Sequence, residues 1–205
     1  MGDILQIYII RYQKLLIFIS VIAVLYVIYT LNYHTDLWNQ KLIFQVETPE
    51  GIVSGSSVVR VVADVKVTMG LLEVAVISHT WRGEARVVEL PNQKYLIVLL
   101  GHPVRMAQYS FIEIILGDFD AKFIPMREYY PKLVELRAAV PLIYDRYPVF
   151  VTFGDLDDPA SVKLVDPDDL ATTFVAGYVL KSVTLEITDE ETTNGYIQNI
   201  LNYFW

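Results

Sequence analysis

The chain has 205 residues, a formal net charge of −8 and no cysteine. The absence of cysteine excludes disulfide bonds, thiolate metal sites and cysteine nucleophiles. Residues 155–205 account for the whole net charge, because they hold ten acidic residues against Lys163 and Lys181. Nucleic acid and anionic lipid repel such an acidic lobe, so we expect no nucleic-acid partner and a C-terminal end that faces away from the bilayer.

An apolar run near the N-terminus begins at Leu15 and ends at Leu31, without a charged residue, a proline or a glycine. As a helix it rises about 25 Å, close to the ~30 Å of a hydrocarbon core, which predicts one membrane-spanning helix in contact with the lipid bilayer. A buried core helix is the alternative, but such a helix usually keeps a polar face. A cleaved signal peptide is disfavoured, because no small-residue cleavage site follows the run.

The charges that flank this run predict its orientation. Arg11 and Lys14 precede it, whereas the first later cation is Lys41. Because positive residues stay on the cytoplasmic side, the sequence predicts a single-pass inner-membrane protein that is retained as a signal anchor. Its N-terminus is then cytoplasmic and its C-terminal domain periplasmic.

Tyrosines recur along one side of the predicted helix. Together with apolar residues they are spaced alternately by three and four positions, which places them on one helix face. They can form aromatic belts at the two membrane interfaces, or a packing seam against another transmembrane helix. The candidate contact face of the anchor consists of Tyr8, Tyr12, Tyr26, Tyr29 and Tyr33.

The first half of the remaining chain reads mainly as strands. Residues 38–47 predict a strand that ends in the turn Thr48-Pro49-Glu50-Gly51. A return strand follows at 52–67, interrupted by the small residues 54–57, and another strand is expected at 72–79. Residues 84–90 and 94–101 predict a hairpin around a turn at 91–93.

The second half mixes helices and strands. Residues 104–116 predict a helix that gives way to a strand at 110, and 128–139 a helix with Pro131 in its first turn. After a strand at 149–153, Asp166 and Pro167 predict the N-cap and first residue of a short helix through 168–174, with Gly177 as its stop. Residues 180–188 alternate as a strand with a slip at Ser182, and 196–205 predict a terminal helix.

These elements predict an α+β protein, in which one N-terminal transmembrane helix is followed by a mainly antiparallel β domain with a few short helices. Residues 1–37 form the cytoplasmic tip and the anchor. Residues 38–205 form a single periplasmic domain, which is long enough to bury its own core.

A cluster of aspartates is the first candidate for chemistry. Asp155, Asp157, Asp158 and Asp168 form a candidate acidic contact patch. A calcium loop that starts at Asp155 would place Pro159 and Ala160 where an EF-hand needs an oxygen ligand and a glycine. Turn and capping roles explain the aspartates without a metal, so we predict no metal site.

The three histidines give no catalytic signature. His34, His79 and His102 lack zinc-ligand spacing. His79 or His102 could pair with a serine at 54, 56 or 57, but those serines lack the G-x-S-x-G context of a nucleophile elbow. We therefore predict no catalytic residue, no cofactor-binding residue and no enzymatic activity.

The C-terminal pattern PVFVTFGDLDDPASVKLVDPDDLATTF, followed by the strand residues TLEIT at 184–188, resembles an uncharacterised family of single-pass membrane proteins from proteobacteria. The fragments TPEG at 48–51 and GEA at 83–85 are similar to the same family. The resemblance implies a membrane-attached domain with no assigned activity. The chain departs from the pattern at its NYFW ending, where a proline and a tryptophan are expected.

The sequence favours an interaction role over catalysis. We expect a membrane-anchored periplasmic domain that serves as a protein-interaction or accessory subunit of an envelope complex, with an envelope or membrane protein or a second copy as its partner. One alternative is an envelope hydrolase, which needs His79 or His102 beside a serine or carboxylate in an open pocket. The other is an immunity or defence-associated protein whose acidic lobe meets a basic toxin.

Overall fold

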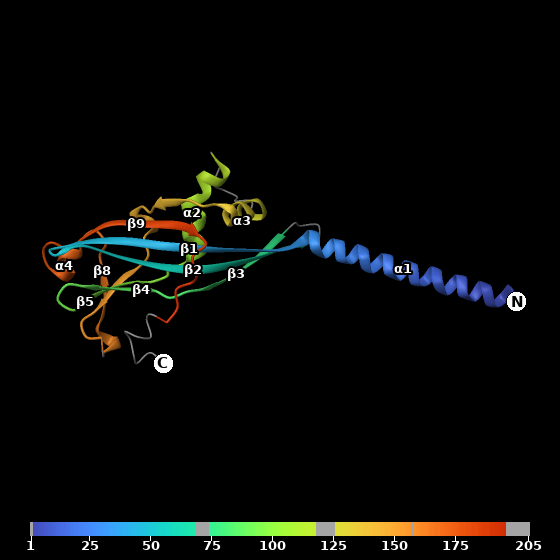
Figure 1. The fold of residues 1–205 in the computed structure, drawn as a ribbon, viewed down its shortest axis with the longest axis horizontal. Coiled ribbons are helices and arrows are strands. Elements are labelled where there is room, and N and C mark those ends of the chain that lie inside the picture. Colours follow the sequence, from blue (N-terminus) through green and yellow to red (C-terminus); the bar gives the residue numbers. More distant parts are fainter. Residues whose placement is uncertain (1, 69–73, 118–125, 157, 196–205) are drawn as a thin grey trace. The chain divides into compact units, whose positions relative to one another are not determined.

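The computed structural model describes residues 2–68, 74–117, 126–156 and 158–195 (Figure 1). Its helices are α1 (Gly2–Asn32), α2 (Pro103–Leu116), α3 (Met126–Glu135) and α4 (Leu170–Phe174), with the short 3-10 helices η1 (Tyr144–Arg146) and η2 (Pro159–Ser161). Its strands are β1 (Tyr33–Thr48), β2 (Gly51–Thr68), β3 (Val74–Arg82), β4 (Arg86–Leu90), β5 (Lys94–Val98), β6 (Ala139–Pro141), β7 (Phe150–Phe153), β8 (Val162–Val165) and β9 (Val179–Thr188). An apolar helix followed by antiparallel sheets and a few short helices confirms the predicted α+β fold.

The chain divides into two compact units. The first consists of residues 1–35 and 64–78, and the second of residues 36–63 and 79–205. The first unit therefore contains α1, the first residues of β1 and the adjoining ends of β2 and β3. The boundary expected between residues 37 and 38 stays a prediction.

In the first unit, α1 passes directly into β1. The helix ends at Asn32, and Tyr33 is the first residue of the strand. The prediction that Tyr33 continues the helix is therefore wrong. The ring of Tyr33 stacks on that of Tyr29 with centroids 5.6 Å apart, and its hydroxyl donates to Asp64 Oδ1 over 3.2 Å. Thr35 Oγ1 donates to the same carboxylate oxygen at 2.7 Å.

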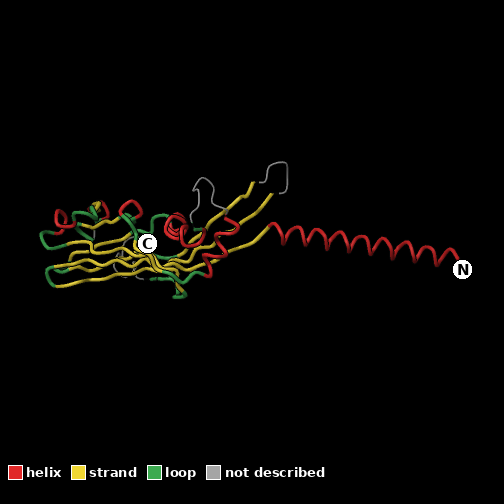
Figure 2. Tube along the Cα trace, turned by 90° about the horizontal axis from the view of Figure 1, so that it is seen from above, coloured by secondary structure: helices red, strands yellow, loops and turns green. Residues whose placement is uncertain are grey.

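The strands form two sheets, whose strands run side by side in Figure 2. The order is β3-β2-β1-β9-β6 in the first sheet and β4-β5-β7-β8 in the second. β1 pairs with β9 in antiparallel register from Asn39 opposite Thr188 to Glu47 opposite Val179. A shift of one residue at Lys181 interrupts this register, next to the slip that the sequence predicts at Ser182.

The main core lies between the two sheets. Alternate side chains of β1 are buried, as expected for a strand with one face on a core. Phe44 of β1 meets Phe150 of β7 edge to face, with centroids 6.4 Å apart. A Cβ atom on Gly55 of β2 would lie 2.4 Å from Val88 Cγ2 of β4 and 2.6 Å from Phe44 Cζ.

This close approach explains the glycine among the small residues at 54–57. The interruption of the strand predicted there is wrong, since β2 runs unbroken from Gly51 to Thr68. Gly55 is small because the side chains of Phe44 and Val88 occupy the space beside it. The turn before it is confirmed, because β1 ends at Thr48 and Thr48 Oγ1 donates to the carbonyl of Gly51 at 2.8 Å.

Two helices differ from their predictions. The strand expected from residue 110 is wrong, since α2 continues to Leu116 and buries Val104, Ala107 and Phe111 at helical spacing. α3 begins at Met126, so Pro131 lies inside the helix and not in its first turn. The helix also ends at Glu135, four residues before the expected end, and β6 pairs with β9 at Ala139 opposite Glu186.

Four further strands confirm their predictions, and one helix corrects its prediction. The hairpin β4–β5 and the strands β7 and β9 lie where the sequence predicts them. α4 is capped by Asp169 and not by Asp166, and it ends at Phe174, before Gly177. Strand β8 is not predicted. The expected terminal helix at 196–205 and the first two residues of the strand expected at 72–79 lie outside the described residues.

Candidate functional site

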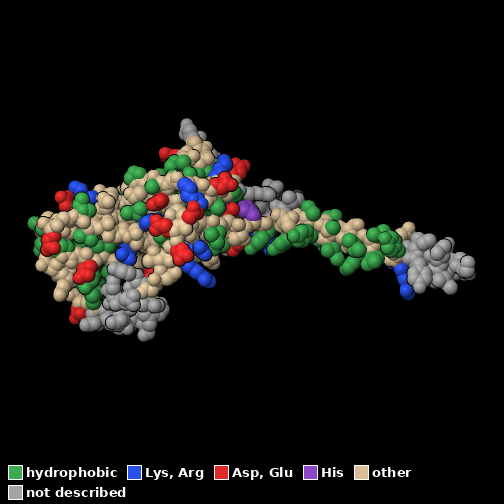
Figure 3. Space-filling view, viewed as in Figure 1, with side chains coloured by type: hydrophobic (Ala, Val, Ile, Leu, Met, Phe, Trp, Pro, Cys, Tyr) green, Lys and Arg blue, Asp and Glu red, His purple; other side chains and the backbone are tan. Residues whose placement is uncertain are grey.

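The helix α1 has the length and composition of a membrane span. A stretch of 20 residues from Arg11 to Thr30 is apolar enough to cross a bilayer, and every one of its residues is exposed. Figure 3 shows hydrophobic side chains along the described helix, with basic side chains near its N-terminal end. The two aliphatic hydroxyls of this stretch are satisfied within the helix: Ser20 Oγ donates to the Leu16 carbonyl and Thr30 Oγ1 to the Val27 carbonyl. The helix can therefore lie in lipid without an unsatisfied aliphatic hydroxyl.

The tyrosines of the candidate anchor face remain available on this helix. Tyr12, Tyr26 and Tyr29 are exposed, and Tyr29 also stacks on Tyr33 of β1. The side chain of Tyr8 lies outside the described part. The contact face that these residues were predicted to form stays a prediction.

In the second unit, a polar and aromatic cluster joins β1 and β3 to the helices α2 and α3. Trp38 of β1 stacks on Tyr130 of α3 with ring centroids 5.4 Å apart. The Tyr130 hydroxyl lies 2.7 Å from His79 Nε2 of β3 and accepts a hydrogen bond from Gln108 Nε2 of α2 at 2.8 Å. A hydrogen bond joins β1 to the start of α2: Gln40 Nε2 donates to the Pro103 carbonyl at 3.1 Å.

The electrostatics of this cluster favour the neutral forms of His79 and Tyr130. Burial lowers the pKa of His79, and the neighbouring His102 lowers it further. Burial raises the pKa of Tyr130 to about 12, and the charge of Asp36 adds to the rise. His79 and Tyr130 are therefore both neutral at pH 7, and the hydrogen bond between them joins α3 to the sheet.

His79 and His102 contact a tyrosine, a tryptophan and the start of a helix. Among the described residues, neither His79 nor His102 hydrogen-bonds a serine or a carboxylate. His102 instead caps α2, because its Nδ1 accepts a hydrogen bond from the Arg105 amide at 3.4 Å. The ring of His102 lies against that of Trp81. His79 and His102 thus contact helices and aromatic rings.

Acidification is expected to weaken the wild-type β domain more than the variant His79→Gln. An unfolded histidine binds a proton near pH 6.5, above the lowered pKa of folded His79. The stabilising effect of neutral His79 is therefore complete above pH 6.5 and is lost as the pH falls towards the folded value. Urea unfolding of both proteins in detergent at pH 7.5 and 5 measures the difference. An identical loss of stability in the two proteins would contradict this assignment.

Aspartates of the acidic segment, which we define as residues 155–169, serve as turn and cap groups. Asp158 Oδ1 accepts from the Ala160 amide at 2.9 Å, and Asp166 Oδ1 from the Asp168 amide at 2.9 Å. Hydrogen bonds from the Thr172 side chain and amide lower the pKa of Asp169. Asp157 lies outside the described residues. Within the described ranges, no group of three or more histidine, aspartate or glutamate side chains could hold a metal ion.

The acidic segment adjoins an apolar groove that the sequence does not reveal. The groove has a volume of about 540 Å³ and lies between the segment 144–150 and the end of β8. Leu164 of β8 is 78% exposed, and Tyr144 and Val149 are also exposed. Two carboxylates, Asp145 and Asp166, stand among its lining residues. The groove thus combines exposed apolar side chains with negative charge, and we call it the β8 groove.

We compared the chain with known proteins. No protein-family model, curated protein or solved structure matches this chain.

Proposed function

We propose that this chain is a single-pass inner-membrane protein whose periplasmic β domain binds a partner protein, as an accessory subunit of an envelope complex. The apolar and exposed helix α1 supports attachment to a membrane. The basic residues Arg11 and Lys14 before the span support a cytoplasmic N-terminus. The C-terminal pattern supports kinship with the single-pass proteobacterial family that it resembles.

The β8 groove is the observation that carries the binding role. The aliphatic side chain of Leu164 is largely exposed to water, and the side chains of Val149 and Tyr144 in the same groove are also exposed. A group of exposed apolar side chains that is surrounded by charged residues is typical of protein contact sites. A partner that covers them removes apolar surface from water, which favours association.

The chemistry of the groove specifies its occupant. In the described part of the chain, β8 pairs only with β7, so its outer edge is open for another strand. Asp145 and Asp166 line the groove, and Asp158 and Asp168 flank the two ends of β8 in the sequence. The occupant that fits is an extended segment of a partner protein, in which apolar side chains alternate with lysine or arginine.

Membrane attachment contributes to this binding. A partner held in the same bilayer meets the β domain at a raised effective concentration, so a groove with few contacts suffices. The exposed tyrosines of α1 provide a second contact with a partner helix in this proposal.

Cross-linking in native membranes tests the proposal. A photoreactive amino acid is placed at Leu164, and mass spectrometry identifies the partner peptide attached to it. We expect an adduct with an extended segment rich in apolar and basic residues. The charge-neutral variant Asp145→Asn/Asp166→Asn is expected to reduce the yield of this adduct at least fivefold, because it removes both groove carboxylates.

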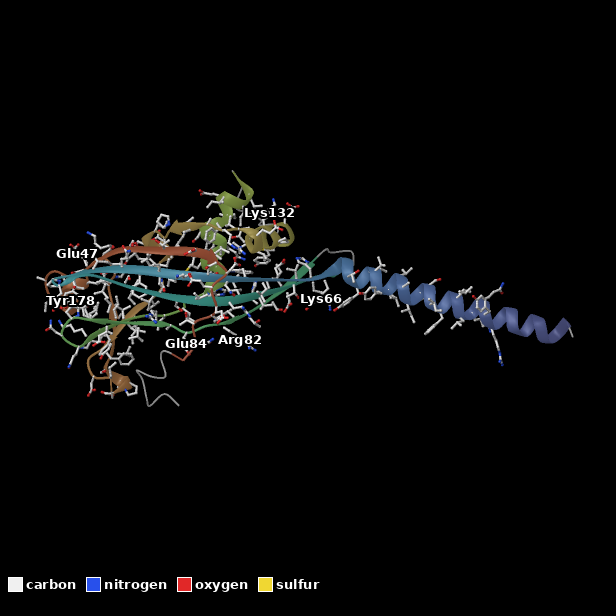
Figure 4. The ribbon with its side chains drawn as sticks, in the orientation of Figure 1. Glu47, Lys66, Arg82, Glu84, Lys132 and Tyr178 are labelled. Carbon is white, nitrogen blue, oxygen red and sulfur yellow. The ribbon has the colours of Figure 1, made fainter. Side chains whose placement is uncertain are left out.

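Lys132 provides the matched control position, because it is exposed on α3, away from β8 (Figure 4). The proposal is wrong if position 132 gives the same adduct in equal yield. It is also wrong if the adduct from position 164 joins two copies of this chain, or if the double asparagine variant leaves the yield unchanged.

A further inference from the structure

A second pocket lies in the second unit, on the sheet face that carries Arg60 and Arg82. It has a volume of about 460 Å³, within the size range of small-molecule sites. Its walls come from three parts of the chain: β2, β3 and the segment that follows β9. The lining residues are Arg60, Val62, Thr80, Trp81, Arg82, Thr192 and Asn194.

The walls of this pocket are held by the fold itself. The Thr193 amide donates to the Val58 carbonyl at 3.0 Å, and the Val58 amide donates to Thr193 Oγ1 at 2.9 Å. Further along, the Gly195 amide donates to Glu84 Oε1 at 2.6 Å. These bonds fix the segment that carries Thr192 and Asn194 against the middle of β2 and the residues that follow β3. The pocket is therefore formed before any ligand binds.

The charge of the pocket is opposite to that of the protein. Among the described residues, two guanidinium groups line it and no carboxylate does, although the chain has a formal net charge of −8. Arg60 Nε donates to Asn39 Oδ1 at 3.1 Å. Arg82 makes no hydrogen bond or ion pair with the described residues, and Glu84, which follows it where β3 ends (Figure 4), is already bonded to the Gly195 amide.

From these observations we infer that the pocket binds a small oxyanion, a phosphate or carboxylate group, between Arg60 and Arg82. Guanidinium groups bind such anions through paired N–H donors. Thr80, Thr192 and Asn194 add hydroxyl and amide groups that can donate to further oxygens. The anion belongs either to a soluble small molecule or to a lipid headgroup, and both present the same oxygens.

Calorimetric titration with inorganic phosphate tests the site. The full-length chain is studied in an uncharged detergent, at constant ionic strength, with chloride replacing phosphate in the reference. We expect saturable binding by the wild type. Arg82→Gln is expected to weaken it at least tenfold, because it removes a guanidinium that makes no hydrogen bond or ion pair with the described residues. Arg82→Lys keeps the charge without the planar donor pair and is expected to weaken it to a smaller extent.

Arg105→Gln is the matched control, since Arg105 is exposed on α2 and outside the pocket. This variant is expected to bind phosphate like the wild type. The inference is overturned if the wild type does not bind phosphate, or if Arg82→Gln and Arg105→Gln bind it equally well. Thermal unfolding of each variant verifies that the β domain is folded.

Lipid nanodiscs distinguish the two sources of the anion. The phosphate titration is repeated in discs of phosphatidylcholine alone and in discs that also contain phosphatidylglycerol. Weaker phosphate binding with phosphatidylglycerol, seen in the wild type and absent in Arg82→Gln, identifies a headgroup in the pocket. Equal binding in both discs identifies a soluble ligand.

Discussion

Replacing Gly55 by alanine is expected to lower the melting temperature of the β domain by about 4–8 °C. The new methyl group would lie 2.4 Å from Val88 Cγ2 and 2.6 Å from Phe44 Cζ, and both side chains are buried. Overpacking of this kind costs about 1–3 kcal/mol, and a loss near 2 kcal/mol gives this shift for a domain of this size. The smaller entropy of the unfolded alanine chain offsets only part of it. Circular dichroism of the detergent-solubilised protein measures the melting temperature.

Two variants make this result specific to the contact between the sheets. Gly154→Ala is the matched control, because its methyl group would lie 3.7 Å from Ser161 Cβ, an ordinary contact, and we expect no loss of stability. Phe44→Leu removes the ring that the new methyl would meet, so adding Gly55→Ala to it should cost less than it does in the wild type. An unchanged melting temperature for Gly55→Ala would show that the sheets are further apart.

The double substitution Ile19→Arg/Ile22→Arg is expected to remove the protein from the membrane fraction. Both residues lie in the middle of the 20-residue span. Each arginine at the centre of a membrane helix costs about 2.5–3.5 kcal/mol on insertion scales. Alkaline carbonate extraction, followed by immunoblotting of the pellet and the supernatant, measures the retained fraction. Wild-type protein and the control Ile19→Leu/Ile22→Leu should stay in the pellet.

The same prediction includes the orientation of the anchor. An alkaline phosphatase reporter fused after Trp205 should be active, because this enzyme matures only outside the cytoplasm. An inactive reporter would reverse the proposed topology. A mature N-terminus located after Leu31 by Edman sequencing would show that the helix is removed and is not an anchor.

Elements with strong local signals could be predicted from the sequence. The turn at Pro49 and Gly51 locates the hairpin of β1 and β2, and Pro91 and Asn92 locate that of β4 and β5. The uninterrupted apolar run locates α1, and the alternation after Ser182 locates β9. In each case a turn residue or a hydrophobic period specifies the backbone without help from distant parts of the chain.

Elements decided by tertiary contacts could not be predicted. The residues of the second half of α2 favour a strand by composition, but burial of Phe111 on the helix face with Val104 and Ala107 decides for a helix. β6 and β8 have only three and four residues, and neither shows a clear alternation of buried and exposed side chains. They are strands because β9 and β7 provide their hydrogen-bond partners.

The candidate sites divide in the same way. The acidic residues near β8 are visible in the sequence because charge is a local property. The β8 groove depends on the pairing of β7 with β8, which brings Val149 and Leu164 together. The oxyanion pocket needs Arg60, Arg82 and Asn194 from three distant segments. A single sequence holds no pattern that joins them.

The pairing of β1 with β9 delays folding during protein synthesis. The ion pair between Lys41 of β1 and Glu190, just beyond β9, joins residues 149 positions apart. A ribosome that adds about 5–20 residues per second takes about 7–30 s to make the intervening chain. During that interval one edge of β1 has no native partner, and an open strand edge invites aggregation. A nascent chain that stays unfolded until β9 emerges would avoid this exposed edge.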